Sequence, residues 1–221
     1  YAGANHITTK GAIQIAKAVE KVGGIDALSV LTPMFVSQTQ HEVYEYYREI
    51  ASETSLPIII YNNRPKTNVT VEPATVAKLA EIDNIVGVKD STGDMTNTEE
   101  YLRLTRGMDN FHVMMGRDTL IYAALCYGAS GAIASCANVA PRIAADIYDK
   151  FMEGDREGAL QAQFKFSALR IATNMGTFPV VLKEALKMIG HDCGNCVEPI
   201  QPLDDAQREK LRGVLVGMGL L

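Results

Sequence analysis

The sequence predicts an α/β fold with a parallel sheet, built from repeated strand–helix units. Short apolar runs alternate with helical stretches, and successive runs lie about 28 residues apart. Most runs are continuously apolar, which is typical of strands buried on both faces of a parallel sheet. Doubly wound sheets and eight-stranded barrels both show this repeat, so periodicity leaves the two architectures open. No glycine-rich nucleotide motif follows a strand, so the sequence does not support nucleotide binding to a doubly wound sheet.

The individual elements follow from local signals in the sequence. The expected strands are residues 27–33, 56–61, 85–89, 111–115 and 131–135, with residues 1–4 as the end of a sixth. Gly23 ends the first helix, Pro73 suits a first helical turn, and Asp94 and Asp118 are expected N-caps. The expected helices between strands are 9–22, 39–54, 72–80, 94–106 and 118–127. The helices expected after the last strand are 141–152, 155–174, 178–189 and 204–216.

Composition and charge exclude several classes of protein. Hydrophobic residues make up 47% and charged residues 21%, as in a folded globular chain. The net charge of −5 provides no basic field for nucleic acid. No apolar run is long enough to span a bilayer, and residues 1–10 do not resemble a signal peptide, so neither a membrane partner nor secretion is expected. Four cysteines are too few for a disulfide scaffold and suit a cytoplasmic location.

Two strand ends carry the candidate chemistry. Lys89 ends the run 85–89, where desolvation disfavours the ammonium form and favours a free amine that can attack a carbonyl. Tyr61 ends the run 56–61, and its phenol can transfer a proton at the same rim. From position alone, a surface lysine and a core tyrosine with a solvated hydroxyl are the commoner interpretations. Cys193 and Cys196 have C-x-x-C spacing but no second ligand pair, so we expect no metal site.

Three motifs resemble those of the dihydrodipicolinate synthase/N-acetylneuraminate lyase family. They are Tyr-Asn-Asn-Arg-Pro-Lys-Thr at 61–67, Val-Gly-Val-Lys-Asp-Ser-Thr-Gly-Asp at 86–94, and Gly-Ala-Ile-Ala-Ser at 131–135 with Ala-Asn-Val-Ala-Pro at 137–141. Their order and spacing match over essentially the whole chain. The resemblance implies a (β/α)8 TIM barrel with a C-terminal helical subdomain. Residues 1–152 are then barrel units and residues 153–221 the helical subdomain.

The resemblance also implies an activity and roles for individual residues. Lys89 forms an imine with pyruvate or another 2-oxo acid, Tyr61 shuttles protons, and Gly116 and the backbone of Ile133 line the pocket. An aldehyde is the second reactant. Neither a metal nor an organic cofactor is expected, because the protonated imine is itself the electron sink. The family habit implies a homo-oligomer, either a dimer or a tetramer.

Several features depart from the family pattern. The resemblance places Tyr1 within the third strand, so the first two βα units and a carboxylate-binding Thr-Thr segment are expected to be absent from the chain. Phe35 stands where the synthase branch has a tyrosine of the proton relay, and a phenyl ring carries no proton. Lys66 stands where the synthase arginine grips a second carboxylate, while Arg64 is two positions away.

These observations predict a Schiff-base-forming aldolase or lyase that acts on pyruvate or a related 2-oxo acid. The departures at Phe35 and Lys66 keep open a 2-keto-3-deoxy sugar acid aldolase or dehydratase of the same family. A non-catalytic homologue that binds a small molecule is the alternative from another class.

Overall fold

The computed structural model describes residues 1–221 and confirms an α/β fold with a parallel sheet. The chain forms two compact units, Tyr1–Ile133 and Ala134–Leu221. The first unit contains the sheet, and the second contains helices only. The division expected after residue 152 concerns a complete barrel and stays a prediction.

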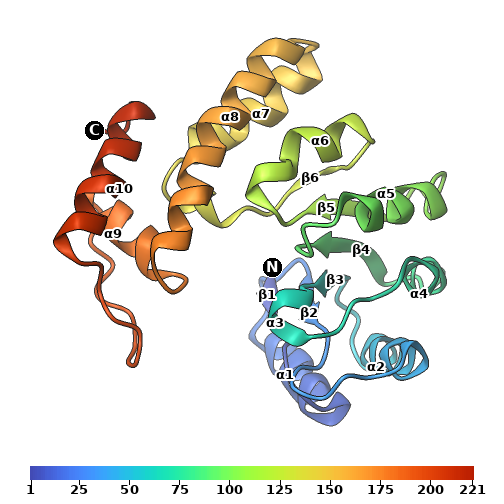
Figure 1. Ribbon diagram of the computed structural model, residues 1–221. Coiled ribbons are helices and arrows are strands. Elements are labelled where there is room, and N and C mark those ends of the chain that lie inside the picture. The colour runs from blue at the N-terminus through green and yellow to red at the C-terminus, as the bar shows by residue number, and fades with distance from the viewer. The chain divides into compact units, whose positions relative to one another are not determined.

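The sheet of the first unit has six parallel strands whose spatial order is their order in the chain (Figure 1). The strands are β1 (Ala2–Gly3), β2 (Leu28–Leu31), β3 (Ile58–Asn62), β4 (Ile85–Asp90), β5 (His112–Met115) and β6 (Gly131–Ala132). This order lacks the reversal that defines a doubly wound sheet, and it is the strand succession of a TIM barrel. Strand β1 confirms the strand expected at residues 1–4.

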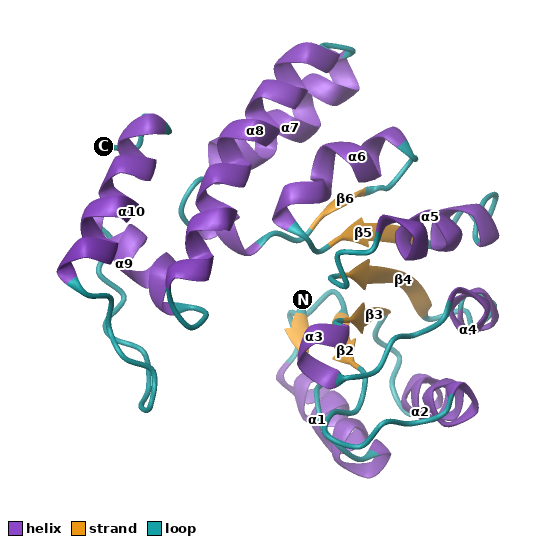
Figure 2. Cartoon of the chain, viewed as in Figure 1, coloured by secondary structure: helices purple, strands orange, loops and turns teal.

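Helices cover the outer side of this sheet (Figure 2). They are α1 (Thr9–Val22), α2 (Gln40–Ser52), α4 (Pro73–Leu79), α5 (Met95–Leu104) and α6 (Ile121–Cys126). Two shorter elements follow strand ends: α3 (Arg64–Thr67) comes after β3, and the 3-10 turn η1 (Asp118–Leu120) comes after β5. Asp94 caps α5, and Thr39 forms a capping box with Glu42 at the start of α2. Asp118 does not cap a helix as expected, because it lies inside the 3-10 turn η1 that precedes α6. The sequence analysis did not predict α3.

The two faces of the sheet differ in burial. Ile58, Ile60 and Val88 are fully buried, and they belong to one apolar cluster with helix residues such as Tyr47 and Leu79. On the other face the side chains of β3 and β4 are partly exposed, as the alternating burial of β3 shows. The continuous apolar runs therefore predicted burial of both faces wrongly, because the helices of this unit cover one face.

The register of β3 and β4 shifts by one residue near their starts. Ile58 pairs with Ile85, but Ile59 pairs with Gly87, so Val86 is an additional residue on β4. A Cβ at position 87 would lie 2.5 Å from the carbonyl oxygen of His112 on β5, which explains the glycine. Beyond this point the two strands stay in register to their carboxyl ends.

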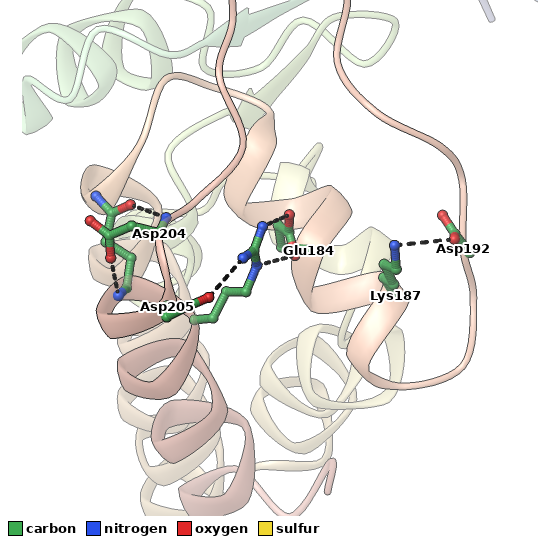
Figure 3. A network of polar contacts seen from close by, with 7 residues as sticks. Glu184, Lys187, Asp192, Asp204 and Asp205 are labelled. Carbon is green, nitrogen blue, oxygen red and sulfur yellow. Dashed lines mark hydrogen bonds and ion pairs between the residues drawn. The ribbon is translucent and has the colours of Figure 1, made fainter.

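The second unit consists of helices, as expected for the end of the chain. They are η2 (Ser135–Asn138), α7 (Pro141–Glu153), α8 (Arg156–Ala172), η3 (Thr173–Met175), α9 (Val180–Met188) and α10 (Asp205–Gly217). Arg208 joins α10 to α9 through Glu184 at 3.3 Å and also contacts Asp205 at 3.2 Å (Figure 3). Asp204 caps α10. None of the helices in either unit has the length and apolar composition of a membrane-spanning segment.

The capping box of α2 provides a test of local stability. Thr39 Oγ1 accepts a hydrogen bond from the Glu42 backbone N–H, so Thr39→Ala should lower the free energy of unfolding by about 1 kcal/mol. Urea denaturation measures this difference. Thr96→Ala is the matched control, because Thr96 is exposed in the first turn of α5 and its hydroxyl makes no cap. Equal losses in the two variants would show that the cap contributes nothing.

Candidate active site

Lys89 and Tyr61 meet at the carboxyl ends of two neighbouring strands. Tyr61 of β3 pairs with Lys89 of β4 in the parallel register, so both side chains leave the sheet on its partly exposed face. The Lys89 Nζ lies 4.1 Å from the centroid of the Tyr61 ring. An ammonium over a tyrosine face is attracted by the ring quadrupole, so this contact holds the amine at the phenol-bearing ring. The juxtaposition expected from the two strand ends is present.

The amine of Lys89 is free to react. Its side chain is half-buried, and no hydrogen bond or ion pair engages its ammonium group. A carboxylate partner would obstruct the approach of a carbonyl carbon to the nitrogen, and Lys89 has none. Lys89 therefore presents an unpaired amino group that the Tyr61 ring holds in position.

The phenol of Tyr61 is oriented by its own loop. Its hydroxyl oxygen accepts a hydrogen bond of 2.8 Å from Asn63 Nδ2. Because that bond uses a lone pair and not the proton, the Tyr61 O–H remains able to donate. A phenol that is held in place while keeping its proton suits proton transfer to an oxygen bound at the lysine.

Gly116 lies directly against the lysine. A Cβ at this position would clash with Ser91 Oγ and would lie 3.1 Å from Lys89 Cε. The Gly116 backbone N–H donates to the Asp90 carbonyl at 2.7 Å, which fixes the approach. A side chain at this position would displace Ser91 and crowd Lys89. The Ser91 hydroxyl is buried beside Gly116 without a hydrogen-bond partner.

Ile133 extends the last strand toward the same region. Its backbone N–H donates to the carbonyl of Met115 at 2.9 Å, which places Ile133 beside the residue that precedes Gly116. The structure thus brings Lys89, Tyr61 and Gly116 together, with Ile133 next along the strand ends.

Arg64 and Lys66 lie on a neighbouring part of the rim. Both are exposed on the short helix α3, and they line a cleft of about 600 Å³. Thr92, Asp94 and Asn97 line the other side of this cleft. Two cations against one carboxylate leave the cleft with a positive balance, which suits an anionic or strongly polar group.

Phe35 is not brought to the lysine. It lies in the loop after β2, where its side chain is 94% exposed and its backbone has a φ of 80°. A left-handed conformation is unfavourable for a bulky residue. The neighbouring Val36 is 63% exposed as well. This loop therefore carries two apolar side chains in solvent and no proton-transferring group.

The cysteine pair lies in a separate place, in the segment between α9 and α10. Lys183 Nζ donates to the backbone carbonyls of Cys193, Gly194 and Asn195, and so holds this segment. Lys187 and Asp192 lie 3.6 Å apart nearby (Figure 3). None of the four cysteines forms a disulfide bond. No group of three histidine, cysteine or acidic side chains in the chain is arranged to hold a metal ion.

Sequence reasoning missed a polar cluster directly beneath the site. Asn62 follows Tyr61 in β3, and Asp90 follows Lys89 in β4. Both side chains are buried and form hydrogen bonds with residues of α5. The signal was present in the sequence, because the apolar runs of β3 and β4 both end in two polar residues. The strands were expected to end one residue too early, so these side chains were assigned to loops.

The comparisons with known proteins identify the class and the family of the chain. The sequence profile described as "Dihydrodipicolinate synthetase family" matches residues 1–217. The chain is an enzyme of the class I aldolase/lyase type. The chain belongs to the dihydrodipicolinate synthetase family.

Individual relatives show the same similarity over nearly the whole chain. A 4-hydroxy-tetrahydrodipicolinate synthase of Archaeoglobus fulgidus is 35% identical over 219 residues, which are 99% of this chain and 75% of that protein. The enzyme of the same name from Thermodesulfovibrio yellowstonii is 37% identical over 220 residues, and the match covers 100% of this chain and 75% of that protein. The crystal structure of dihydrodipicolinate synthase from Thermotoga maritima matches with a TM-score of 0.94 at 31% identity. That match covers 99% of this chain and 75% of the Thermotoga chain.

Proposed function

We propose that Lys89 forms an imine with pyruvate or a related 2-oxo acid, and that the chain acts as an aldolase or lyase through this intermediate. The observation that carries the proposal is the unpaired Lys89 amine held 4.1 Å from the Tyr61 ring at the carboxyl ends of β3 and β4. Active sites of βα barrels lie at this end of the strands. The names of the curated relatives support the same chemistry.

The proposed steps use only side chains of this site. The Lys89 amine adds to the ketone carbon, the oxygen takes up a proton, and the carbinolamine loses water to give an iminium. The iminium withdraws electrons from the neighbouring carbon, which loses a proton and becomes an enamine. The enamine carbon bonds to an aldehyde carbon, and the aldehyde oxygen takes up a proton. Hydrolysis of the imine then restores the amine, and the reverse sequence cleaves the same bond.

Tyr61 is the proposed carrier of these protons. Its hydroxyl keeps its proton while Asn63 holds its oxygen, so it can deliver that proton to the carbinolamine oxygen and accept one later. Gly116 lets Ser91 and Lys89 pack closely against the chain that follows β5. No step requires a metal ion or an organic cofactor.

The second substrate has two candidates. The relatives are named 4-hydroxy-tetrahydrodipicolinate synthases, which favours an aldehyde that carries a carboxylate. Phe35 and Lys66 favour a neutral hydroxylated aldehyde or a sugar-derived 2-oxo acid. Phe35 is exposed and carries no proton, and Lys66 offers one flexible charge in place of a planar fork. We propose the neutral aldehyde class as the better partner.

The complete assembly is also a proposal. The six strands correspond to six of the eight strands of a closed barrel, since the matches that cover 99% of this chain leave about a quarter of each relative's length outside the match. The exposed Phe35 and Val36 support self-association into a dimer or a tetramer, because burial of these side chains is favourable. One solved relative is described as a monomeric variant, so association and fold are separable in this family.

Reductive trapping tests the proposal directly. Pyruvate and sodium borohydride should convert the imine to a stable secondary amine and add a covalent mass to the peptide that contains Lys89. Peptide mass spectrometry after digestion locates the adduct. Lys89→Arg should abolish trapping, because a guanidinium stays protonated and does not add to a ketone.

Two exposed lysines in the same unit serve as internal controls for this experiment. Lys66 and Lys78 should stay unmodified. An adduct on either of them in place of Lys89, or no adduct on a folded chain, would contradict the proposed function. The absence of any adduct together with retained pyruvate binding would favour the non-catalytic homologue.

Tyr61→Phe tests the proton carrier. The enamine step exchanges the methyl protons of pyruvate with deuterium from the solvent, and proton NMR follows this exchange without any aldehyde. Loss of the phenol should slow the exchange by roughly 10²-fold, the usual scale for a general acid or base. Pyruvate affinity should change much less, because the aromatic ring remains. An unchanged exchange rate would remove Tyr61 from the mechanism.

A panel of aldehydes tests the second substrate. With pyruvate as the common donor, neutral hydroxylated aldehydes should give a higher kcat/KM than aspartate semialdehyde, because Lys66 leaves one carboxylate oxygen without a fixed donor. Lys66→Arg is the matched variant and should raise the relative rate with aspartate semialdehyde. A clear preference of the unaltered chain for aspartate semialdehyde would instead assign the synthase reaction.

A further inference from the structure

A cluster of buried polar side chains lies on the helix-covered side of the sheet, one residue beyond the Lys89–Tyr61 pair. Asn62 follows Tyr61, Asp90 follows Lys89, and the two pair across β3 and β4. Asn62 is 0% and Asp90 is 1% exposed. A buried amide and a buried carboxylate are costly unless every polar atom finds a partner. The hydrogen bonds of this cluster are therefore informative.

The Asp90 carboxylate is held by four neutral donors. Its Oδ1 accepts from Asn62 Nδ2 at 3.3 Å and from the Thr92 backbone N–H at 3.0 Å. Its Oδ2 accepts from Thr98 Oγ1 at 2.7 Å and from Asn97 Nδ2 at 3.2 Å. A carboxylate has about four acceptor sites, so the four donors satisfy it. The donors come from β3, from the loop after β4 and from α5, so the carboxylate ties three segments together.

Asn62 connects this carboxylate to Tyr101 of α5. Its Nδ2 also donates to the Tyr101 hydroxyl at 2.8 Å, and its Oδ1 accepts from the Val71 backbone N–H at 3.1 Å. The Tyr101 hydroxyl donates to the Val71 carbonyl. Burial raises the pKa of Tyr101, and the charge of Asp90 raises it further, so the phenol stays protonated and can donate. We call Asn62, Asp90 and Tyr101 the strand-end network.

The network reaches the site through the backbone. The Ser91 N–H donates to the Asn62 carbonyl at 2.8 Å, and the Gly116 N–H donates to the Asp90 carbonyl at 2.7 Å. Gly116 packs against both Ser91 and Lys89, because a Cβ at position 116 would clash with Ser91 Oγ and would lie 3.1 Å from Lys89 Cε. A shift of either strand end would therefore move Lys89 relative to Tyr61 and to Gly116.

We propose that the strand-end network is a positioning device that holds Lys89 and Tyr61 in the geometry for imine formation. The inference rests on the proposed function and adds residues that do not touch the substrate. Apolar side chains of similar volume would fill the same core space without needing partners, so stability alone does not require this cluster. Fully satisfied buried networks are rigid, and a displacement of about 1 Å at a reacting group costs about 10²-fold in rate.

The test compares two buried tyrosines. Tyr101→Phe removes the network hydroxyl and keeps the ring. Tyr46→Phe is the matched control, because Tyr46 is also buried and its hydroxyl donates to a backbone carbonyl, that of His6, at 3.2 Å. Tyr101→Phe should slow deuterium exchange into saturating pyruvate by roughly tenfold and leave the pyruvate KM within about twofold. Tyr46→Phe should lower the thermal midpoint similarly and leave the exchange rate within about twofold.

A second variant, Asp90→Asn, removes the negative charge and replaces one accepting carboxylate oxygen with an NH2 group. That group would face donors of the network instead of accepting from them. It should slow the exchange and the borohydride trapping more than Tyr101→Phe does, and if it does not fold, Tyr101→Phe decides alone. Exchange at the unaltered rate in both network variants, or an equal loss in Tyr46→Phe, would overturn the positioning role. If pyruvate and borohydride do not label Lys89 in the chain of native sequence, the proposed function is contradicted, and this inference falls with it.

Discussion

The in-register pairing of β3 with β4 is the constraint on which both the site and the core depend. It places Tyr61 beside Lys89 and Asn62 beside Asp90. Because successive side chains of a strand point to opposite faces, the first pair lies on the partly exposed face and the second lies against the helices. A slip of one residue would send each side chain to an environment that suits it badly. The lysine would then face the apolar cluster.

The extra residue on β4 sets this register. Ile58 pairs with Ile85, and continuing that pairing without a shift would set Tyr61 opposite Val88. The shift at Val86 moves every later residue of β4 by one position and brings Lys89 opposite Tyr61. Gly87 follows the extra residue. Because it has no side chain, the His112 carbonyl of β5 can lie close to its Cα. Bulges near active sites commonly re-aim a side chain in this way.

The same residues show how far the sequence alone could reach. The helix at 9–22 and the strands were predictable to within a few residues, because apolar periodicity and caps such as Asp94 are local signals. The strand-end positions of Lys89 and Tyr61 were also predictable, since both residues end apolar runs, whereas the roles proposed for them came from the family resemblance of their motifs. The register shift at Val86 was not predictable, because the three consecutive isoleucines Ile58, Ile59 and Ile60 do not indicate which face of the sheet each one occupies. Helix α3 has four residues and shows no period, and the exposure of Phe35 depends on the backbone of its loop.

The polar residues that end β3 and β4 also protect the register. Ile60 and Val88 disfavour a slip, because it would move them from the buried face to the partly exposed one. Asp90 adds a stricter condition, because its carboxylate is satisfied only where Asn62 and the first turn of α5 present their donors together. A slipped strand would leave that charge buried without partners, at a cost of several kcal/mol. Specifying a register is the best-attested use of a buried polar group. The residue that follows the lysine therefore excludes the pairing in which the lysine would lose its place beside Tyr61.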